Sequence, residues 1–323
     1  MNRRKFVTVL CASTALGGAV WSPLASAQAA YPVKPIRVIV PYAPGGVVDV
    51  QARAVTDTMQ KILKQPIVIE AKPGASGNIG AREVASAAPD GYTLLVSASF
   101  LINNPLLETS LPWAPGDFTP VGRFAVSPSY FVVPANSAAT SVKEFAKMAA
   151  KASPVLQYGN GGTGTPQTMS NELFRVSAGI PLESVMYKGA PPIVPDLING
   201  LVSMAILPST VAIPQVKAGN LRALANISSS RSPQLPDVPT IAEAGYPDVT
   251  TLSWYGLHAP AGTPEPVIRA LAAAMKEACA TEQVKQRLLT AGGEVAFLDT
   301  PDFARFLASD TERWSRLVKI IKQ

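Results

Sequence analysis

The fold is decided by residues 36–63, IRVIVPYAPGGVVDVQARAVTDTMQKIL. The β-branched run at 36–41 has the composition of a strand, and the following YAPGG at 42–46 cannot continue either a strand or a helix. Apolar residues then recur at alternating steps of four and three, which predicts a helix beginning near Val47. The glycines let the backbone approach a bound group, and the unpaired N–H groups of the first helical turn suit an anion. The alternative is a plain strand-to-helix connection in which Asp49 only complements the helix dipole.

The length bears on the number of domains, and the N-terminal segment indicates an exported protein. At 323 residues the chain exceeds the usual size of one domain, so two lobes and one large α/β unit are both possible. Residues 1–29 have the pattern of an export signal, with a basic start, an apolar run at 7–20 and small residues at 25–29. The string RRKFV also resembles a twin-arginine signal, so both export routes stay open. No later segment approaches about 18 uninterrupted apolar residues, and we expect a soluble mature chain.

Charge and cysteine content narrow the possible partners. Loss of the signal takes Lys plus Arg from 28 to 25 against 22 acidic residues, and the net charge from +6 to about +3. Basic residues do not cluster with aromatic residues, so we expect no nucleic-acid partner. Cys279 is the only cysteine beyond the signal, which excludes an intramolecular disulfide and leaves stability to the core.

The stretch after the opening unit repeats its alternation of strand and helix. A strand, a short helix and another strand are predicted at 66–70, 79–87 and 92–96, after a loop that ends in a possible helix cap at Asn78. This β-α-β-α-β order implies a parallel sheet. Ser97 and Ser99 follow the third strand, so their hydroxyls are expected at the sheet edge that carries Gly45 and Gly46. The alternative is that both serines are solvated loop residues.

A second α/β unit lies in the middle of the chain. After a strand at 131–134 and a helix opened by a capping box at Ser141, the pattern predicts strand, glycine loop, helix and strand at 155–158, 159–165, 169–176 and 184–187. The loop matches G-x-G-x-x-G, but no acidic residue follows the second strand to hold a ribose, and an exported protein has no ready supply of NAD. The loop N–H groups and the hydroxyls of Thr163 and Thr165 suit a carboxylate or another small anion instead.

The remainder of the chain is predicted to be mainly helical. Strands are expected at 201–207 and 221–225, followed by a capping box at Thr240 that Gly245 terminates. Two longer helices are expected to begin at the Thr-Pro pairs 263–264 and 300–301. We therefore expect a helical C-terminal third.

Catalytic and metal-binding patterns are missing from the sequence. His258 is the only histidine and Cys279 the only mature cysteine, so no cluster has the spacing of a zinc site, and we expect neither metal nor cofactor. No G-x-S-x-G motif occurs, and only His258 could serve a serine as base. We expect His258 to be a structural or surface residue and the protein not to be an enzyme. The alternative is an exported hydrolase with an unrecognised catalytic site.

Blocks along the whole mature chain resemble the Bug family of periplasmic solute receptors. The matching segments, which occur in the family's order, are 44–49 with 52–53, 72–77, 89–94, 187–200, 218–225, 236–245 and 259–264. The resemblance implies an α/β, two-lobed periplasmic-binding-protein fold of type II-like topology, in which each lobe is a mixed, mostly parallel sheet flanked by helices. It places lobe 1 at 30–128 plus 228–323 and lobe 2 at 129–227, joined by two crossing strands.

The resemblance also implies a function and a set of ligand contacts. Family members look like monomeric periplasmic receptors that pass a small carboxylate to the large and small membrane subunits of a tripartite tricarboxylate transporter. The identity of the carboxylate stays open: it could be citrate-like, an amino acid or an aromatic acid. Together with positions at strand ends, the resemblance predicts ligand contacts at Tyr42, Ala43, Pro44, Gly45, Gly46, Asp49, Ser97, Ser99, Gly161, Gly162, Thr163, Gly164, Thr165, Tyr187, Lys188, Gly189, Asp196 and Leu207. The chain departs from the family at Asn160, where Ser or Ala is frequent, and near Thr168, where the family has a His.

Overall fold

A computed structural model of the protein describes residues 31–162 and 165–321. The predicted export signal and two predicted ligand contacts, Thr163 and Gly164, lie outside the described residues. No helix in the described ranges is both long enough and apolar enough to cross a membrane.

The first lobe is built on a six-stranded mixed sheet in the order β11-β4-β10-β3-β1-β2. Its strands are β1 (Ile36–Val40), β2 (Ile67–Ala71), β3 (Thr93–Ser97), β4 (Phe118–Ser127), β10 (Ser253–Pro260) and β11 (Glu294–Leu298). Helices flank it: α1 (Val47–Leu63), α2 (Asn78–Ala85), α3 (Phe100–Leu107), α8 (Glu265–Ala280) and α9 (Glu282–Thr290). The short 3-10 helices η1 (Ala75–Gly77), η2 (Pro115–Asp117) and η3 (Pro247–Val249) occupy connections.

The second lobe is built on a five-stranded mixed sheet in the order β7-β6-β8-β5-β9. Its strands are β5 (Ser129–Pro134), β6 (Gln157–Asn160), β7 (Glu183–Met186), β8 (Met204–Pro208) and β9 (Leu221–Asn226). Its helices are α4 (Val142–Ala149), α5 (Pro166–Ala178), α6 (Ile193–Ile198) and α7 (Ser209–Lys217). The predicted two-lobed α/β architecture with mixed sheets is confirmed.

Each sheet combines parallel and antiparallel pairs. Within the described residues, β1 pairs in parallel with β2 and β3, but β10 and β11 both run antiparallel to β4, and β10 is also antiparallel to β3. In the second sheet, β6 is parallel to β7 and β8, whereas β5 is antiparallel to β8 and β9. The antiparallel pairs arise because β10 and β11 in the first sheet, and β5 in the second, run opposite to the strands of the local β-α-β units.

The C-terminal third contains two strands that the sequence pattern did not predict, β10 and β11. Every residue of β10 is buried, and its eight residues include Gly256, so it shows neither alternation nor a helical period. The strand β4 was also missed. The capping box at Thr240 forms: the Thr240 N–H donates to Glu243 Oε2 at 2.7 Å, and the Glu243 N–H donates to Thr240 Oγ1 at 3.1 Å. The segment that it opens consists of turns rather than a helix. Gly245, at φ +99°, ends that segment too soon for a further helical turn.

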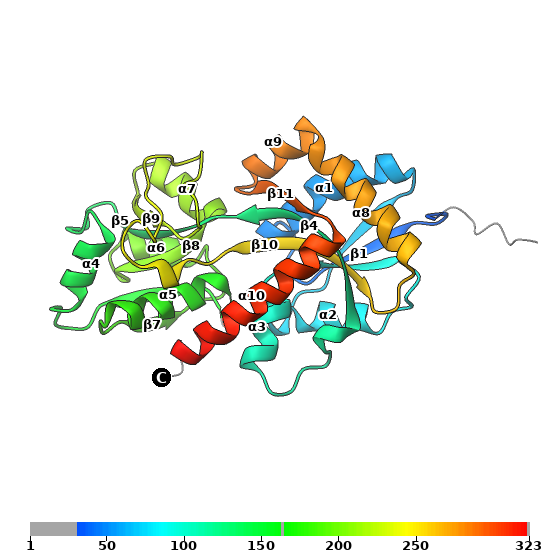
Figure 1. Ribbon diagram of the computed structural model, residues 1–323. Coiled ribbons are helices and arrows are strands. Elements are labelled where there is room, and N and C mark those ends of the chain that lie inside the picture. The colour runs from blue at the N-terminus through cyan, green and yellow to red at the C-terminus, as the bar shows by residue number, and fades with distance from the viewer. Residues whose placement is uncertain (1–30, 163–164, 322–323) are drawn as a thin grey trace, which may run out of the picture. The chain divides into compact units, whose positions relative to one another are not determined.

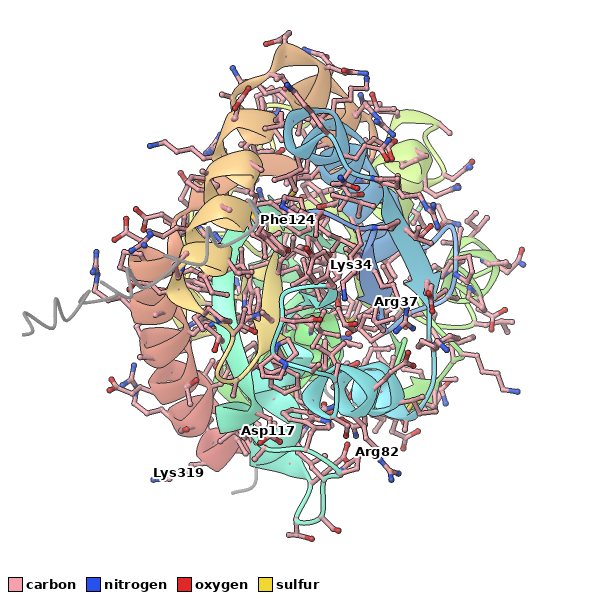
Figure 2. All side chains as sticks on the ribbon, turned by 90° about the vertical axis from the view of Figure 1, so that its right-hand side faces the viewer. Lys34, Arg37, Arg82, Asp117, Phe124 and Lys319 are labelled. Carbon is pink, nitrogen blue, oxygen red and sulfur yellow. The ribbon has the colours of Figure 1, made fainter. Side chains whose placement is uncertain are left out.

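The cores form around the two sheets and are linked by the last helix, α10 (Thr300–Ile321). Phe124 of β4 lies in the interior of the first core, while Arg82 and Lys319 point outward (Figure 2). Trp314 of α10 belongs to the same buried cluster as Phe131 of the second sheet. In Figure 1 the red helix α10 lies beside β4 and β10, the two strands that run together between the sheets. The C-terminal helix therefore fastens to both lobes.

We expect Gly256→Ala to destabilise the protein, because a Cβ there would lie 2.6 Å from Phe303 Cζ and 2.8 Å from the Gly122 carbonyl oxygen. Overpacking of this kind costs about 1–3 kcal/mol of unfolding free energy. Gly116→Ala is the control, since no atom lies within 4 Å of the position that its new methyl group would take. That control should change stability by under about 0.5 kcal/mol. Equal midpoints for the two variants in urea would contradict tight packing at the crossing strands.

Candidate functional site

Two adjoining cavities lie between the lobes, and residues of both lobes line each. The first chamber has a volume of about 320 Å³ and the second a volume of about 700 Å³. The chambers share a set of wall residues that joins them: Tyr42, Val47, Val48, Gly161, Thr165, Gln167 and Pro208. Most of these residues come from the two strand-loop-helix units that the sequence pattern singled out.

The loop after β1 borders both chambers and is held by Asp49. The Gly45 N–H, at φ +75°, donates to Asp49 Oδ2 at 3.0 Å, and the Gly46 N–H donates to the Ala43 carbonyl at 3.2 Å. Arg53 Nη2 lies 3.0 Å from Asp49 Oδ1. Burial acts to raise the pKa of Asp49, but the hydrogen bonds from Arg53 and Gly45 outweigh it and lower that pKa. Asp49 is 3% exposed and lines neither chamber, so it positions the loop from behind.

The first turn of α1 forms part of the wall. No side chain caps this helix at Gly46. The first N–H groups of an α-helix have no partner within the helix, and the dipole makes that end favourable for negative charge. Because Val47 and Val48 border both chambers, an anion at the junction of the chambers lies next to these donors.

Two serines at the end of β3, Ser97 within the strand and Ser99 beyond it, have different surroundings. Ser99 lines the first chamber, whereas Ser97 is fully buried with its Oγ 2.7 Å from His258 Nδ1. Burial lowers the pKa of His258 to about 3, so the imidazole is neutral at all ordinary pH values. His258 borders a separate cavity of about 200 Å³ between α3 and α10. The ring is buried and packs against Phe118 and Phe303.

A buried polar cluster supports one wall of the first chamber. Asn78 Oδ1 accepts hydrogen bonds from Asn104 Nδ2 at 2.8 Å and from Trp113 Nε1 at 3.0 Å. Asn104 also donates to the Ser76 carbonyl at 3.1 Å, and both Asn104 and Ser76 line the chamber. The expectation that Asn78 caps a helix is wrong, because its side chain makes these contacts while Gly77 occupies the cap position.

Asn160 and Thr168 brace the glycine loop of the second lobe. Asn160 Oδ1 accepts the Gly162 N–H at 3.0 Å and lies 2.6 Å from the Thr168 hydroxyl. Its Nδ2 donates to Ser184 Oγ at 3.1 Å. The two positions at which the chain departs from its family pattern are therefore hydrogen-bonded to each other. Thr165, which lines both chambers, caps α5 by accepting the Thr168 N–H at 3.2 Å.

The two loops of the second lobe are packed directly on each other. The Gly189 N–H donates to the Gly161 carbonyl at 3.1 Å, and a Cβ at Gly161 would lie 3.1 Å from the Gly189 carbonyl carbon. A side chain at position 161 would therefore crowd the Gly189 backbone, which favours glycine there. Gly162 lines the first chamber and Gly189 the second.

The remaining predicted contacts lie away from the chamber walls. The Tyr187 hydroxyl donates to Asp196 Oδ2 at 2.5 Å, and burial together with this bond raises the pKa of Tyr187 to about 12. Lys188 is exposed, and Leu207 is fully buried in the core of the second lobe. None of these side chains lines either chamber, and neither does Pro44. Ala43 and Gly46 line the second chamber.

Several lining residues were missed by sequence reasoning. Gln167 borders both chambers, and its Nε2 donates to Ser129 Oγ at 2.9 Å and Ser253 Oγ at 3.3 Å, which links α5 to both crossing segments. Ser253 and Tyr255 reach the first chamber from β10. Gln167 lies in the first turn of the helix that follows the predicted glycine loop, so its position at a helix start could have identified it as a lining residue. Nothing local pointed to β10.

The chamber walls are uncharged. Among the described residues that line either chamber, none is Asp, Glu, Lys, Arg or His. Burial raises the pKa values of Tyr42 and Tyr255 above their ordinary range, so both phenols stay protonated. Across 31–162 and 165–321, no group of three His, Cys, Asp or Glu side chains could hold a metal ion. The arrangement offers neutral hydrogen-bond donors from two lobes to one small ligand.

A site lined by both lobes of an α/β protein is typical of a solute-binding protein. The chain belongs to the family described as "Tripartite tricarboxylate transporter family receptor", whose profile matches residues 51–322. It is 33% identical to the protein BugT of Bordetella pertussis over 99% of this chain and 98% of BugT. The Bug-family resemblance is thus confirmed.

Solved structures show the same fold. The periplasmic binding protein BugD is 29% identical, with a TM-score of 0.80 over 90% of this chain and 99% of BugD. Rpa4515 of R. palustris, solved with adipate, is 31% identical with a TM-score of 0.82 over 90% of this chain and 98% of that one. MatC of Rhodopseudomonas palustris, solved with bound malate, is 32% identical with a TM-score of 0.78 over 89% and 100%.

We expect Asp49→Asn to weaken ligand binding several-fold and to lower the melting temperature by only about 2–4 °C. The amide keeps the side-chain shape but loses the charge that strengthens the bond from Gly45, a net loss of about 1 kcal/mol in holding the loop. Calorimetric titration and thermal unfolding measure the two effects. Asp117→Asn is the matched control, since Asp117 accepts the Ala114 N–H at 2.7 Å in a loop that lines neither chamber.

The pH dependence of the same pair of proteins tests the electrostatic cause. The pKa of Asp49 is lowered in the folded state, so its stabilisation is fully present above the unfolded value of about 3.9. That stabilisation is lost as pH falls through the lower folded value. The stability difference between wild type and Asp49→Asn should therefore be constant above about pH 5 and shrink in more acidic buffer. A difference that grows on acidification would overturn the assignment.

Proposed function

We propose that this protein is a periplasmic receptor that captures one small carboxylate between its lobes and delivers it to the large and small membrane subunits of a tripartite tricarboxylate transporter. The observation that carries the proposal is the pair of adjoining chambers, walled by both lobes and lined, among the described residues, by uncharged side chains. Membership of the receptor family supports it, and so do the adipate and malate found in relatives.

The proposed receptor is a monomer whose first 29 residues are removed on export. We place lobe 1 at 30–128 plus 228–323 and lobe 2 at 129–227. The end of β4 at Ser127 and the start of β5 at Ser129 support the first crossing, and the end of β9 at Asn226 supports the second. Closure of the lobes would then bend the chain at these two places.

In this proposal the carboxylate lies at the junction of the chambers. The first lobe offers the loop 42–46 and the uncapped start of α1, and the second offers Gly161, Gly162 and Thr165 together with Gly189. Hydroxyl and amide groups of Ser99, Gln167 and Ser253 are available to the rest of the ligand. Asp49 and Asn160 act by holding the two loops in shape.

The energetics suit a reversible receptor. A carboxylate that accepts two or three charge-assisted hydrogen bonds gains about 1.5–3 kcal/mol from each before entropy losses. A net value near the roughly −8 kcal/mol of a micromolar complex is then within reach. Binding of this strength needs no catalytic group and permits release to a transporter.

The geometry gives little support to the alternative of an exported hydrolase. The described residues bring one serine and the histidine together, Ser97 and His258, but both are buried and neither lines a chamber. With its pKa lowered to about 3, His258 is a weak base for activating a hydroxyl.

The first test is a thermal-shift screen of the mature protein against dicarboxylates, aromatic acids, alkyl acids and amino acids. A bound ligand stabilises by mass action, by about 2.7 kcal/mol at a hundred-fold excess over Kd, so a hit should raise the melting temperature by several degrees. Each hit is then titrated calorimetrically and followed by chromatography. We expect one-to-one binding with the compound unchanged, and consumption of the compound would refute a pure receptor.

Closure is the second test. A ligand that bridges loops on both lobes favours the closed arrangement through contacts that an open one cannot make. Small-angle scattering should show a smaller radius of gyration with saturating ligand. Gly162→Leu should bind more weakly and compact less, because its side chain would enter the first chamber from the second lobe.

Gly219→Leu is the control for closure, since Gly219 also has a positive φ, +75°, but has no atom within 4 Å of an added Cβ and lines neither chamber. It carries the backbone strain of the substitution without touching the ligand site. If wild type binds in the calorimeter with an unchanged radius of gyration, the pocket is preformed and the hinge proposal fails.

A further inference from the structure

The two chambers differ in the chemistry of their walls. The first presents hydrogen-bonding side chains, with Ser99, Asn104 and Ser253 among them. The second, at about 700 Å³, is more than twice as large as the first, at about 320 Å³. Its own part of the wall is mainly aliphatic, with Val50, Ile193, Ile206 and Val211. The cleft as a whole therefore has a hydrogen-bonding end and an apolar end.

We propose that the ligand is a carboxylate with an apolar body, an alkyl chain or an aryl ring, that carries a single negative charge. This inference rests on the proposed receptor function and adds the class of ligand. The carboxylate lies against the glycine loops and the start of α1, and the apolar body fills the second chamber. Citrate-like and other multiply charged acids bind more weakly.

The absence of charge in the wall is what separates these ligand classes. Tyr42 is the only ionisable residue among the described residues that line the second chamber, and its pKa is raised, so its partly buried phenol stays neutral. A second carboxylate placed among valine, isoleucine and proline side chains would lose its water without gaining a cation. Lys188, next to Gly189 in the sequence, is exposed and does not line the chamber.

Apolar contact would instead raise affinity with ligand size. Each methylene moved from water to an apolar wall strengthens binding by about four-fold. The chamber has room for several such groups. Affinity should therefore climb along a series of straight-chain monocarboxylates until the chamber is full.

Hexanoate and adipate form a matched pair for the test, because they have the same six-carbon length and differ only in a methyl against a second carboxylate. We expect calorimetry to show hexanoate binding at least ten-fold more tightly than adipate, and affinity rising from butanoate to hexanoate. Tighter binding of adipate or citrate would overturn the inference while leaving the receptor function in place. Failure of every carboxylate to bind would refute the receptor function itself.

A substitution in the wall supplies the second arm. Val50 lines the second chamber from α1 and is 40% exposed, so an arginine can be accommodated there. Val50→Arg should reverse the preference: the affinity for adipate should rise several-fold, and the affinity for hexanoate should fall several-fold. Val68→Arg is the control, because Val68 is 47% exposed on β2 and lines neither chamber. Equal effects of the two arginines, or none from Val50→Arg, would contradict a ligand body in the second chamber.

Discussion

The antiparallel pairing of β4 with β10 is the constraint on which the rest of the structure depends. Ser127 and Ser253 are paired at the end of this ladder, and β5 of the second sheet starts two residues after Ser127. The same two strands therefore belong to the first core and carry the chain to the second. Because Ser253 and Tyr255 of β10 also line the first chamber, the element that joins the lobes is part of the ligand site.

The C-terminal helix stiffens this junction. Trp254 of β10 packs on Phe303 of α10 with ring centroids 5.4 Å apart, and its Nε1 donates to the buried Asp310 at 3.1 Å. Burial raises the pKa of Asp310, against the opposing influence of Arg313 and Trp254. On the other side, the Ser127 hydroxyl donates to the Gly292 carbonyl at 2.8 Å. Movement between the lobes must therefore preserve or exchange these contacts, which favours two discrete arrangements over continuous bending.

The parts of the fold that sequence could predict are those whose signals are local. The unit at 36–63 combines strand composition, a glycine turn and helical periodicity within 28 residues, and the structure has each element there. Strands β4, β10 and β11 could not be recognised in the same way, because their partners lie far along the chain and β10 is buried on both faces. Long-range pairing leaves little trace in a local pattern.

The candidate site divides along the same line. Gly45, Gly161 and Thr165 were found because a strand, a glycine loop and a helix start follow one another in sequence. Gln167 and Ser253 come together only through the tertiary fold, where a single amide links α5 to both crossing segments. Asp49 shows why a local pattern can be ambiguous. Its carboxylate lies in the first turn of α1, where it complements the helix dipole, and it also accepts the Gly45 N–H, so one side chain fits both interpretations.

A receptor has to release the solute that it binds, and an uncharged cavity wall favours release because it binds a carboxylate only moderately. A cation buried opposite a carboxylate would hold it strongly in either lobe alone, whereas backbone N–H groups and hydroxyls give moderate contacts that sum only when both loops reach the ligand. In the proposed receptor, affinity would be tied to the arrangement of the lobes, because separating them would remove the Gly161 loop from the cavity walls while the Gly45 loop stays with the first lobe. A partner that pulls the lobes apart lowers the affinity and frees the solute without having to compete for it.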